Sequence, residues 1–279
     1  MTAPTSASMD SAPAFAQQIG DIARAAGEAI LAIYHSDFAV QTKEDASPLT
    51  AADLAAQQVI MAGLAELDSV LPVLSEEAKA LAWSERQHWT RYWLVDPLDG
   101  TREFVKRNGE FTVNIALIDD RQSVLGVVLA PVTGELYIAE QGHGAWLQTQ
   151  AGGDWTRLRA RPLAQPPVMA GSRSHGVLQD SMLQALLGPE HQLVSLGSSL
   201  KFCLIARGAA DVYLRLGLTS EWDTAAAQCV LQEAGGAVLD LHGQPFSYNR
   251  GESLLNPEFI AVGDPTVDWA ARLRVATQS

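Results

Sequence analysis

Residues 93–101 are an apolar run that ends in two carboxylates and a glycine: Trp93-Leu94-Val95-Asp96-Pro97-Leu98-Asp99-Gly100-Thr101. The apolar part predicts a buried strand, and the Pro and Gly that follow predict a turn. Pro97 fixes one φ angle and Gly100 gives the backbone turning freedom. Such a turn can aim the two Asp side chains at one point, although Asp-Pro and Asp-Gly are also ordinary turn dipeptides. The segment is the first candidate for a functional site.

Other carboxylates occur on both sides of this segment. Glu76-Glu77 follow a predicted strand at 71–74, and Asp223 lies in the first turn of a predicted helix at 221–233. Taken singly, these acids have ordinary explanations as surface residues or as anions near a helix N-terminus. Asp53 has one too, because Thr50 and Asp53 form a capping-box pattern. The spacing alone does not show that these residues converge.

If the carboxylates did converge, their repulsion would require bound cations. Oxygen-only ligands suit Mg²⁺ better than zinc. Two or more Mg²⁺ ions can neutralise phosphate oxygens, lower the pKa of a bound water and stabilise a leaving alkoxide. The pattern therefore favours hydrolysis of a phosphate ester over other chemistries.

The rest of the sequence predicts two units, an antiparallel sheet packed on two helices and a second α/β unit. Apolar residues recur at helical spacing from Phe15 to Ile33, and a second helix begins after Thr50 with a stripe formed by Leu54, Met61, Leu64 and Leu67. Short β-rich runs with turn signals between them fill residues 70–148 and predict an antiparallel sheet. After 167, strand and helix patterns alternate, which is typical of an α/β unit. We expect a ligand site between the two parts.

Composition excludes several classes of function. The chain of 279 residues is 47% hydrophobic and 18% charged, which fits one large globular domain or two modest ones. Its net charge of −13, without a long basic run, disfavours nucleic-acid binding but allows a small phosphorylated substrate. No stretch approaches the roughly 20 apolar residues of a membrane span. The two cysteines show no disulfide or zinc spacing, so a cytoplasmic location is expected.

Three motifs together resemble the inositol monophosphatase superfamily of metal-dependent, lithium-sensitive phosphatases. They are Ser75-Glu76-Glu77, Asp96-Pro97-Leu98-Asp99-Gly100-Thr101 and Glu221-Trp222-Asp223-Thr224-Ala225-Ala226, in the family's order and approximate spacing. The resemblance covers nearly the whole chain. It implies an α+β or α/β fold, a layered αβαβα sandwich. It also implies a lobe at 1–155 that carries most metal ligands and a lobe at 156–279 that contributes Asp223 and substrate contacts.

The resemblance implies a role for each matched residue. Two or three Mg²⁺ ions would be held by Glu76, Asp96, the Leu98 carbonyl, Asp99 and Asp223. Asp53 and Thr101, with Glu76, would orient an attacking water. The same resemblance implies direct in-line attack without a phosphoenzyme. The substrate contacts it implies are Glu76, Leu98, Asp99, Gly100, Thr101 and Asp223, with Gly100 and Thr101 offering N–H groups to the phosphate.

Within the superfamily, three further stretches resemble the bacterial 3'(2'),5'-bisphosphate nucleotidases, which link the chain to sulfate assimilation. They are residues 101–114, Ser172-Arg173-Ser174-His175 and Gly197-Ser198-Ser199-Leu200-Lys201-Phe202. The implied reaction converts adenosine 3',5'-bisphosphate to AMP and phosphate. Arg173, His175 and Lys201 are expected to contact the additional negative charge of this small nucleotide. Arg102 stands where the family more often has Lys, and the charge is kept.

Three alternatives stay open from the sequence. The same metal site would serve inositol 1-phosphate or a sugar phosphate. A phosphatase with an aspartyl nucleophile is disfavoured, because two residues rather than one separate Asp96 from Asp99. A non-catalytic metal-binding or ligand-binding protein is disfavoured by Thr101 beside the acids. Peripheral association with the inner membrane and the oligomeric state are left open.

Overall fold

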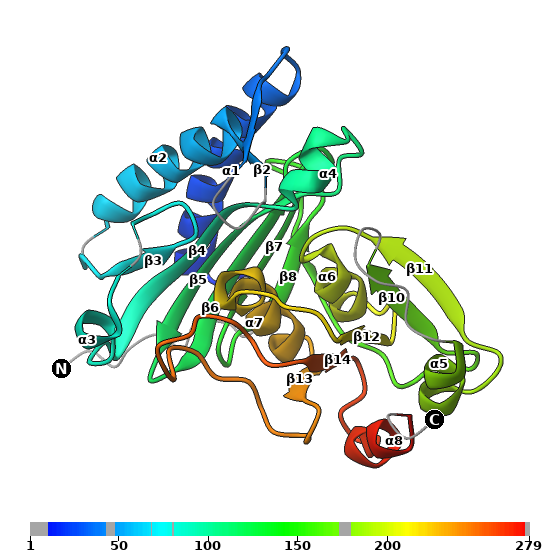
Figure 1. The fold of residues 1–279 in the computed structure, drawn as a ribbon. Helices are drawn as coiled ribbons and strands as arrows, with labels where there is room; N and C mark the ends of the chain where they lie inside the picture. Colours follow the sequence, from blue (N-terminus) through cyan, green and yellow to red (C-terminus); the bar gives the residue numbers. More distant parts are fainter. Residues whose placement is uncertain (1–10, 43–47, 68, 80, 173–179, 277–279) are drawn as a thin grey trace.

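The chain folds into five alternating layers of helix and sheet (Figure 1). The computed structural model describes residues 11–42, 48–67, 69–79, 81–172 and 180–276. Helices α1 and α2 cover one face of a seven-stranded sheet, and α6 and α7 lie between that sheet and a five-stranded one. Helices α5 and α8 pack together on the outer side of the smaller sheet. This arrangement is the predicted αβαβα sandwich.

The larger sheet has the strand order β3-β4-β5-β6-β7-β8-β9. Its strands are β3 (Val73–Ser75), β4 (Arg91–Asp99), β5 (Thr112–Asp119), β6 (Gln122–Ala130), β7 (Glu135–Glu140), β8 (Gly144–Gln148) and β9 (Thr156–Arg157). All neighbours pair antiparallel except β3, which runs parallel to β4. The sheet is therefore mixed, which corrects the antiparallel prediction. The parallel pairing matters because it brings the ends of β3 and β4 to the same edge of the sheet.

The smaller sheet has the order β11-β10-β12-β14-β13 and is also mixed. Its strands are β10 (Val168–Ser172), β11 (Gln192–Leu196), β12 (Val212–Arg215), β13 (Ala237–Asp240) and β14 (Phe259–Val262), and β1 (Val40–Thr42) and β2 (Pro48–Thr50) form a separate hairpin. The shorter helices are α3 (Trp83–Arg86), α4 (Thr101–Val105), α5 (Asp180–Leu187) and α8 (Trp269–Ala276). Crossovers through α5 and α6 give β10 parallel neighbours on both sides.

Small residues make up much of the buried faces of helices α1 (Ala14–Tyr34) and α2 (Ala51–Ala65). A methyl group on Gly27 would come within 2.6 Å of Leu129, so this helix lies close against the sheet. The predicted stripes are partly wrong, because Phe15 is 37% and Leu54 46% exposed. The buried face of α2 is instead formed by Ala52, Asp53, Ala56, Ile60 and Leu64. Close packing favours short side chains on this buried face. The face also includes the carboxylate of Asp53.

The helix predicted at 221–233 is interrupted. Residues Glu221–Asp223 form the 3₁₀ turn η1, and α7 begins afterwards and spans Ala225–Glu233. The Ser220 amide donates to Asp223 Oδ2 at 2.9 Å, and the Thr224 hydroxyl donates to the Glu221 carbonyl at 3.1 Å. Side chains thus compete with the helical hydrogen bonds in this turn. The interruption fixes where the Asp223 carboxylate lies.

The middle helices α6 (Leu200–Ala206) and α7 join the two sheets through one hydrophobic cluster. Helix α7 packs on β6 so closely that a methyl group on Gly126 would lie 2.1 Å from the Ala226 carbonyl oxygen. The predicted lobe boundary between 155 and 156 falls directly before β9, which pairs with β8. The division into two lobes stays a prediction.

Candidate active site

A β-bulge places the two acids of the Asp-Pro-Leu-Asp segment on the same face of the sheet. Asp96 pairs with Asn114 and Asp99 pairs with Thr112, so three steps along β4 match two steps along β5. In a regular strand, residues three apart point to opposite faces. The bulge absorbs one residue, and Pro97, which has no N–H to donate, lies within it. Both carboxylates therefore face one cavity.

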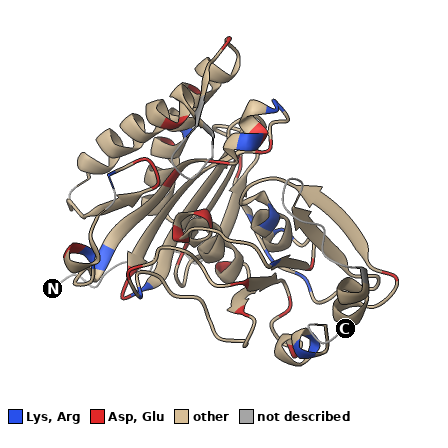
Figure 2. Ribbon diagram, in the orientation of Figure 1, with Lys and Arg blue, Asp and Glu red and all other residues tan. Residues whose placement is uncertain are grey.

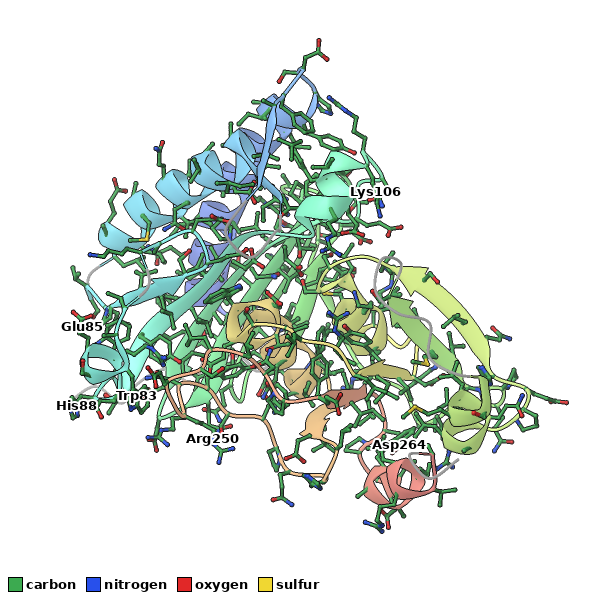
Figure 3. The ribbon with its side chains drawn as sticks, in the orientation of Figure 1. Trp83, Glu85, His88, Lys106, Arg250 and Asp264 are labelled. Carbon is green, nitrogen blue, oxygen red and sulfur yellow. The ribbon has the colours of Figure 1, made fainter. Side chains whose placement is uncertain are left out.

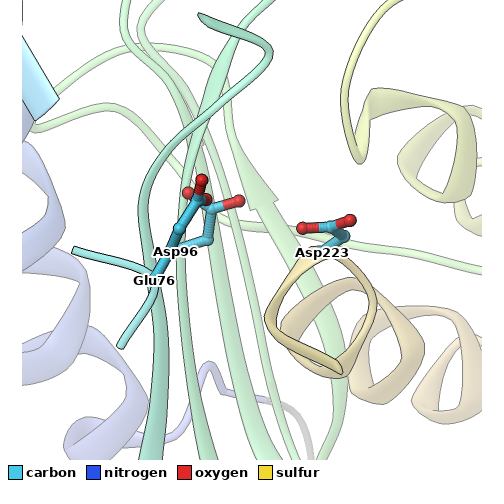
Figure 4. Close-up of side chains that lie close together, drawn as sticks. All are labelled: Glu76, Asp96 and Asp223. Carbon is cyan, nitrogen blue, oxygen red and sulfur yellow. The ribbon is translucent and has the colours of Figure 1, made fainter. Parts of the chain in front are cut away.

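Glu76 and Asp223 reach the same place from two other elements. The Glu76 amide donates to the Val95 carbonyl at 3.2 Å, which sets Glu76 beside Asp96 at the end of β3. Asp223 approaches from η1 on the opposite side (Figure 4). Oxygen atoms of Glu76, Asp96 and Asp223 all lie within 4.8 Å of one another. Residues far apart in the chain thus form one acidic cluster.

The acidic cluster is electrostatically strained. Burial, followed by repulsion from Glu76, Asp99 and Asp223, raises the pKa of Asp96 well above its usual range. Burial and the neighbouring Asp99 and Glu76 do the same to the pKa of Asp223. Two backbone amides partly offset these rises: Asp96 accepts from the Leu98 amide at 3.0 Å and Asp223 from the Ser220 amide at 2.9 Å. A cation among these oxygens would relieve the repulsion.

Asp99 lies beside this cluster in a different environment. Its Oδ2 accepts from the Ser199 amide at 2.6 Å and from Asn114 Nδ2 at 3.5 Å. Partial burial raises the pKa of Asp99 to about 6, and the opposing effects of Lys201 and the Ser199 amide limit the rise. The protein itself therefore supplies part of the charge compensation at Asp99.

Asp53 connects the start of α2 to the cavity. Its Oδ2 accepts from the Thr50 amide at 2.8 Å and from the Thr50 hydroxyl at 2.7 Å, and Thr50 Oγ1 accepts from the Ala52 amide at 3.2 Å, so the predicted capping box is present. Its Oδ1 lies 3.3 Å from the Thr101 hydroxyl, which donates to it. The capping role and a role beside Thr101 are thus compatible, because the two oxygens serve different partners.

Two basic side chains, Lys201 and Arg215, line the same cavity as the acids. Lys201, on α6, is 5% exposed, and burial lowers its pKa to about 8. Its Nζ donates to the Leu196 and Ser198 carbonyls. Arg215, at the end of β12, donates to the Gly217 and Leu218 carbonyls at 3.2 and 2.9 Å. Figure 2 shows basic residues on α6 and β12 and acidic ones on the facing part of the larger sheet.

One cavity of about 640 Å³ collects most of the predicted site residues. It is lined by Glu76, Asp96, Leu98, Asp99, Gly100, Thr101, Lys201 and Asp223. Arg173 and His175 lie outside the described residues. Gly100 has φ 93°, a conformation that favours glycine, and it ends β4 so that Thr101 begins α4. The turn predicted from the sequence is therefore present.

Sequence reasoning missed Arg215, which lines the cavity. A lone cation at the end of the apolar strand Val212–Leu214 was the available signal, because ligands of α/β sheets gather at strand ends. It also assigned no individual role to Thr112, Asn114 or Ser199, although it quoted the stretches that contain them. Their hydrogen bonds join segments distant in sequence, so no local pattern indicates them.

The donor set fits a hard cation. Glu76, Asp96 and Asp223 offer carboxylate oxygens, and the site has neither sulfur nor imidazole among the described residues that form this cluster. Such a set suits Mg²⁺ or a similar divalent ion. The raised pKa values of Asp96 and Asp223 point the same way, because a bound cation would offset the burial and repulsion that disfavour their charged forms.

The chain belongs to the inositol monophosphatase family, whose sequence profile matches residues 14–268. Among named relatives, it is 51% identical over 244 residues to the 3'(2'),5'-bisphosphate nucleotidase CysQ of Escherichia coli K12, covering 87% of this chain and 97% of the relative. It is 38% identical over 252 residues to CysQ of Haemophilus influenzae, covering 89% of this chain and 92% of the relative.

Solved structures agree with this family assignment. CysQ from Bacteroides thetaiotaomicron superposes with a TM-score of 0.77 at 40% identity, over 89% of this chain and 97% of that one. The inositol monophosphatase from Anabaena gives a TM-score of 0.72 at 22% identity, over 95% of each chain, and shows the fold alone. None of the helices in the described part of the chain combines the length and the apolar character needed to cross a membrane.

Proposed function

We propose that the protein is a Mg²⁺-dependent 3'(2'),5'-bisphosphate nucleotidase that converts adenosine 3',5'-bisphosphate to AMP and phosphate. The observation that carries the proposal is one cavity lined both by three clustered carboxylates and by the basic side chains of Lys201 and Arg215. A substrate with two phosphates can use the acidic cluster, through bound cations, and the basic side chains at once. The 51% identity to a CysQ nucleotidase supports the same substrate class.

Glu76, Asp96, the Leu98 carbonyl, Asp99 and Asp223 would hold two or three Mg²⁺ ions. When bound, these ions supply Lewis-acid polarisation of the phosphate and lower the pKa of water. In this proposal a water molecule would attack phosphorus directly, the bond to the 3' oxygen would break, that oxygen would take up a proton to become the 3' hydroxyl of AMP, and no phosphoenzyme would form. The carboxylates and the Leu98 carbonyl would contribute by holding the ions in the cavity.

Thr101 and Asp53, with Glu76, would orient the attacking water. The Thr101 hydroxyl lies 3.3 Å from Asp53 Oδ1 and 3.4 Å from the Leu98 carbonyl oxygen, and when it donates to Asp53 its lone pairs can accept a hydrogen bond from water. Thr50 holds the other oxygen of Asp53 and keeps the carboxylate oriented. A proton can thus pass from water through Thr101 to Asp53 as the P–O bond forms.

The basic part of the cavity would bind the rest of the nucleotide. Lys201 and Arg215 supply positive charge for the second phosphate, as do Arg173 and His175 in the proposal. Leu218 and Leu255 line the same cavity with 74% and 50% exposure and offer an apolar surface to the nucleoside. Gly100 and Thr101 would present N–H groups to the phosphate that is removed.

Phosphate release from adenosine 3',5'-bisphosphate and from inositol 1-phosphate, measured in parallel with and without Mg²⁺, tests this function. We expect Mg²⁺-dependent turnover with a clear preference for the nucleotide and with inhibition by Li⁺. A preference for the inositol ester would instead favour the inositol or sugar phosphatase alternative. Trapping of a phosphoaspartate would contradict the direct attack by water. A role in sulfate assimilation and a cytoplasmic location belong to the same proposal.

A further inference from the structure

Two stretches that the sequence singled out without individual roles meet at Asp99. Thr112 and Asn114 lie on β5, whereas Ser199 lies in the loop before α6, more than eighty residues away in the chain. Thr112 is 0%, Asn114 1% and Ser199 2% exposed. A buried polar group needs hydrogen-bond partners, so the partners of these three residues show what they are arranged to hold.

All three residues belong to one hydrogen-bond chain that ends on Asp99. Ser199 Oγ donates to Asn114 Oδ1 at 2.8 Å, and Thr112 Oγ1 lies 2.8 Å from Ser199 Oγ. Because Ser199 has one hydroxyl proton and gives it to Asn114, Thr112 must be the donor to Ser199. The amide of Asn114 is thereby oriented with its Nδ2 toward Asp99.

Both donors reach the same oxygen of Asp99. The Ser199 amide and Asn114 Nδ2 each donate to Oδ2. Asp99 also lines the cavity, and its hydrogen bonds from the described residues Ser199 and Asn114 both go to Oδ2. Asp96 and Asp223, in contrast, accept from backbone amides within their own turns, Leu98 and Ser220. Asp99 is thus oriented by groups from two distant segments.

The loop that carries Ser199 is shaped to make this contact. The Gly197 amide donates to Glu110 Oε2 at 2.8 Å, and a methyl group on Gly197 would lie 2.7 Å from the Glu103 side chain and from the Glu110 carbonyl oxygen. Ser198 has φ 48°, in the left-handed region that costs a non-glycine residue energy. This conformation of Ser198 directly precedes the Ser199 amide, which donates to Asp99 Oδ2.

We propose that Ser199, Asn114 and Thr112 are positioning residues that commit one oxygen of Asp99 to the protein and leave the other for a metal ion. The docking of the 197–199 loop on β5 then completes the metal site. This inference rests on the metal-ligand role of Asp99 in the proposed function, but not on the identity of the substrate. Removing a residue that hydrogen-bonds to a metal ligand commonly weakens metal affinity by about 10- to 100-fold.

Titration of the full-length protein with Mg²⁺ alone, followed by thermal unfolding, tests the inference. We expect Ser199→Ala to raise the Mg²⁺ concentration for half-maximal stabilisation about tenfold. Thr112→Val should raise it about threefold, through loss of one hydrogen bond, and Thr112→Ser should restore the wild-type value. Gln148→Ala is the matched control, because this buried amide at the end of β8 accepts from Arg24 and donates to the Gly153 carbonyl, and Gln148 is not among the residues that line the cavity.

A double variant separates positioning from general loss of stability. If Ser199 acts through Asp99, Asp99→Asn combined with Ser199→Ala should shift the Mg²⁺ midpoint no more than Asp99→Asn alone. An unchanged midpoint in Ser199→Ala, additive shifts, or an equal shift in Gln148→Ala would overturn the inference. If Ser199→Ala does not fold, the Thr112→Val and Thr112→Ser pair decides. Since no substrate is used, a failure of the nucleotide assignment would leave this result unaffected.

Discussion

The acidic and the basic residues of the candidate active-site cavity differ in how the protein balances their charges. Glu76, Asp96 and Asp223 are crowded together, and the pKa values of Asp96 and Asp223 are raised by burial and mutual repulsion. Lys201 and Arg215, the basic side chains of the same cavity, already donate to backbone carbonyls close to them in the chain. The acidic side therefore needs cations to become complete, whereas the basic side is formed by the protein alone. Substitutions on the two sides should have different consequences.

The largest effect should come from Asp96→Asn. The substitution removes a negative charge from the crowded acidic side, so we expect activity to fall by at least about a thousandfold while the Mg²⁺-free fold is kept or stabilised. Thermal unfolding should also lose most of its response to Mg²⁺. Asp119→Asn is the control, because Asp119 forms an exposed pair with Arg91 on the same sheet. Near wild-type turnover in Asp96→Asn would contradict the metal assignment.

Thr101→Val should have the next largest effect. It removes the hydroxyl that links the cavity to Asp53 without altering the carboxylates, so kcat should fall about a hundredfold while the Mg²⁺ midpoint stays near that of the wild type. Thr101→Ser keeps the hydroxyl and should recover most of the turnover. If Thr101→Val and Thr101→Ser show equal rates, the proposed path of the proton is wrong.

Lys201→Met tests the basic side. Loss of a charged donor should raise KM for adenosine 3',5'-bisphosphate about tenfold, with a much smaller change for glycerol 2-phosphate, which has a single phosphate. Lys106→Met is the matched control, because Lys106 is exposed beyond the end of α4 (Figure 3). Equal changes for both substrates would indicate that Lys201 supports the fold or the metal site and does not select the nucleotide.

The smallest effect concerns stability and pH in the absence of Mg²⁺. Burial raises the pKa of Asp99 to about 6 and that of Glu221 to about 7, so the folded state binds protons more tightly than the unfolded chain. Their contribution to stability is fully present below the usual carboxylate pKa of about 4 and is lost as the pH rises through about 6 to 7. The melting temperature in EDTA should therefore fall from about pH 5 to about pH 8.

Saturating Mg²⁺ should reduce that pH dependence, because the cation takes the place of the protons on the acidic side. Each kcal/mol lost corresponds to about 2–4 °C for a chain of this size class. Asp96→Asn in EDTA should show a shallower decline than the wild type. A melting temperature that rises over this range in EDTA would show that these carboxylates are not strained in the folded protein.

Local patterns in the sequence predicted the main elements and most of the acidic side. The strand before Asp96, the turn at Gly100 and the capping box of Thr50 and Asp53 depend on neighbouring residues, so their signals are short-range. The same patterns were wrong where packing decides. Leu54 is exposed although it is apolar. Helix α2 packs closely against α1 and β4, which favours the small Ala52 and Ala56 on its buried face. The predicted helix at 221–233 is interrupted by side-chain hydrogen bonds in the η1 turn, which the spacing of hydrophobic residues does not indicate.

By itself, the sequence determined the residue types of the site and, through three motifs, the family to which the chain belongs. Only the tertiary structure decided how those residues meet. The bulge between Asp96 and Asp99 turns both acids to one face, and Asp223 arrives from η1 across the cavity. Asp99 receives its orientation from Ser199 in the opposite half of the chain. Charge repulsion and hydrogen-bond direction depend on distances in space, and residues so far apart in the chain acquire those distances only when the two sheets pack around α6 and α7.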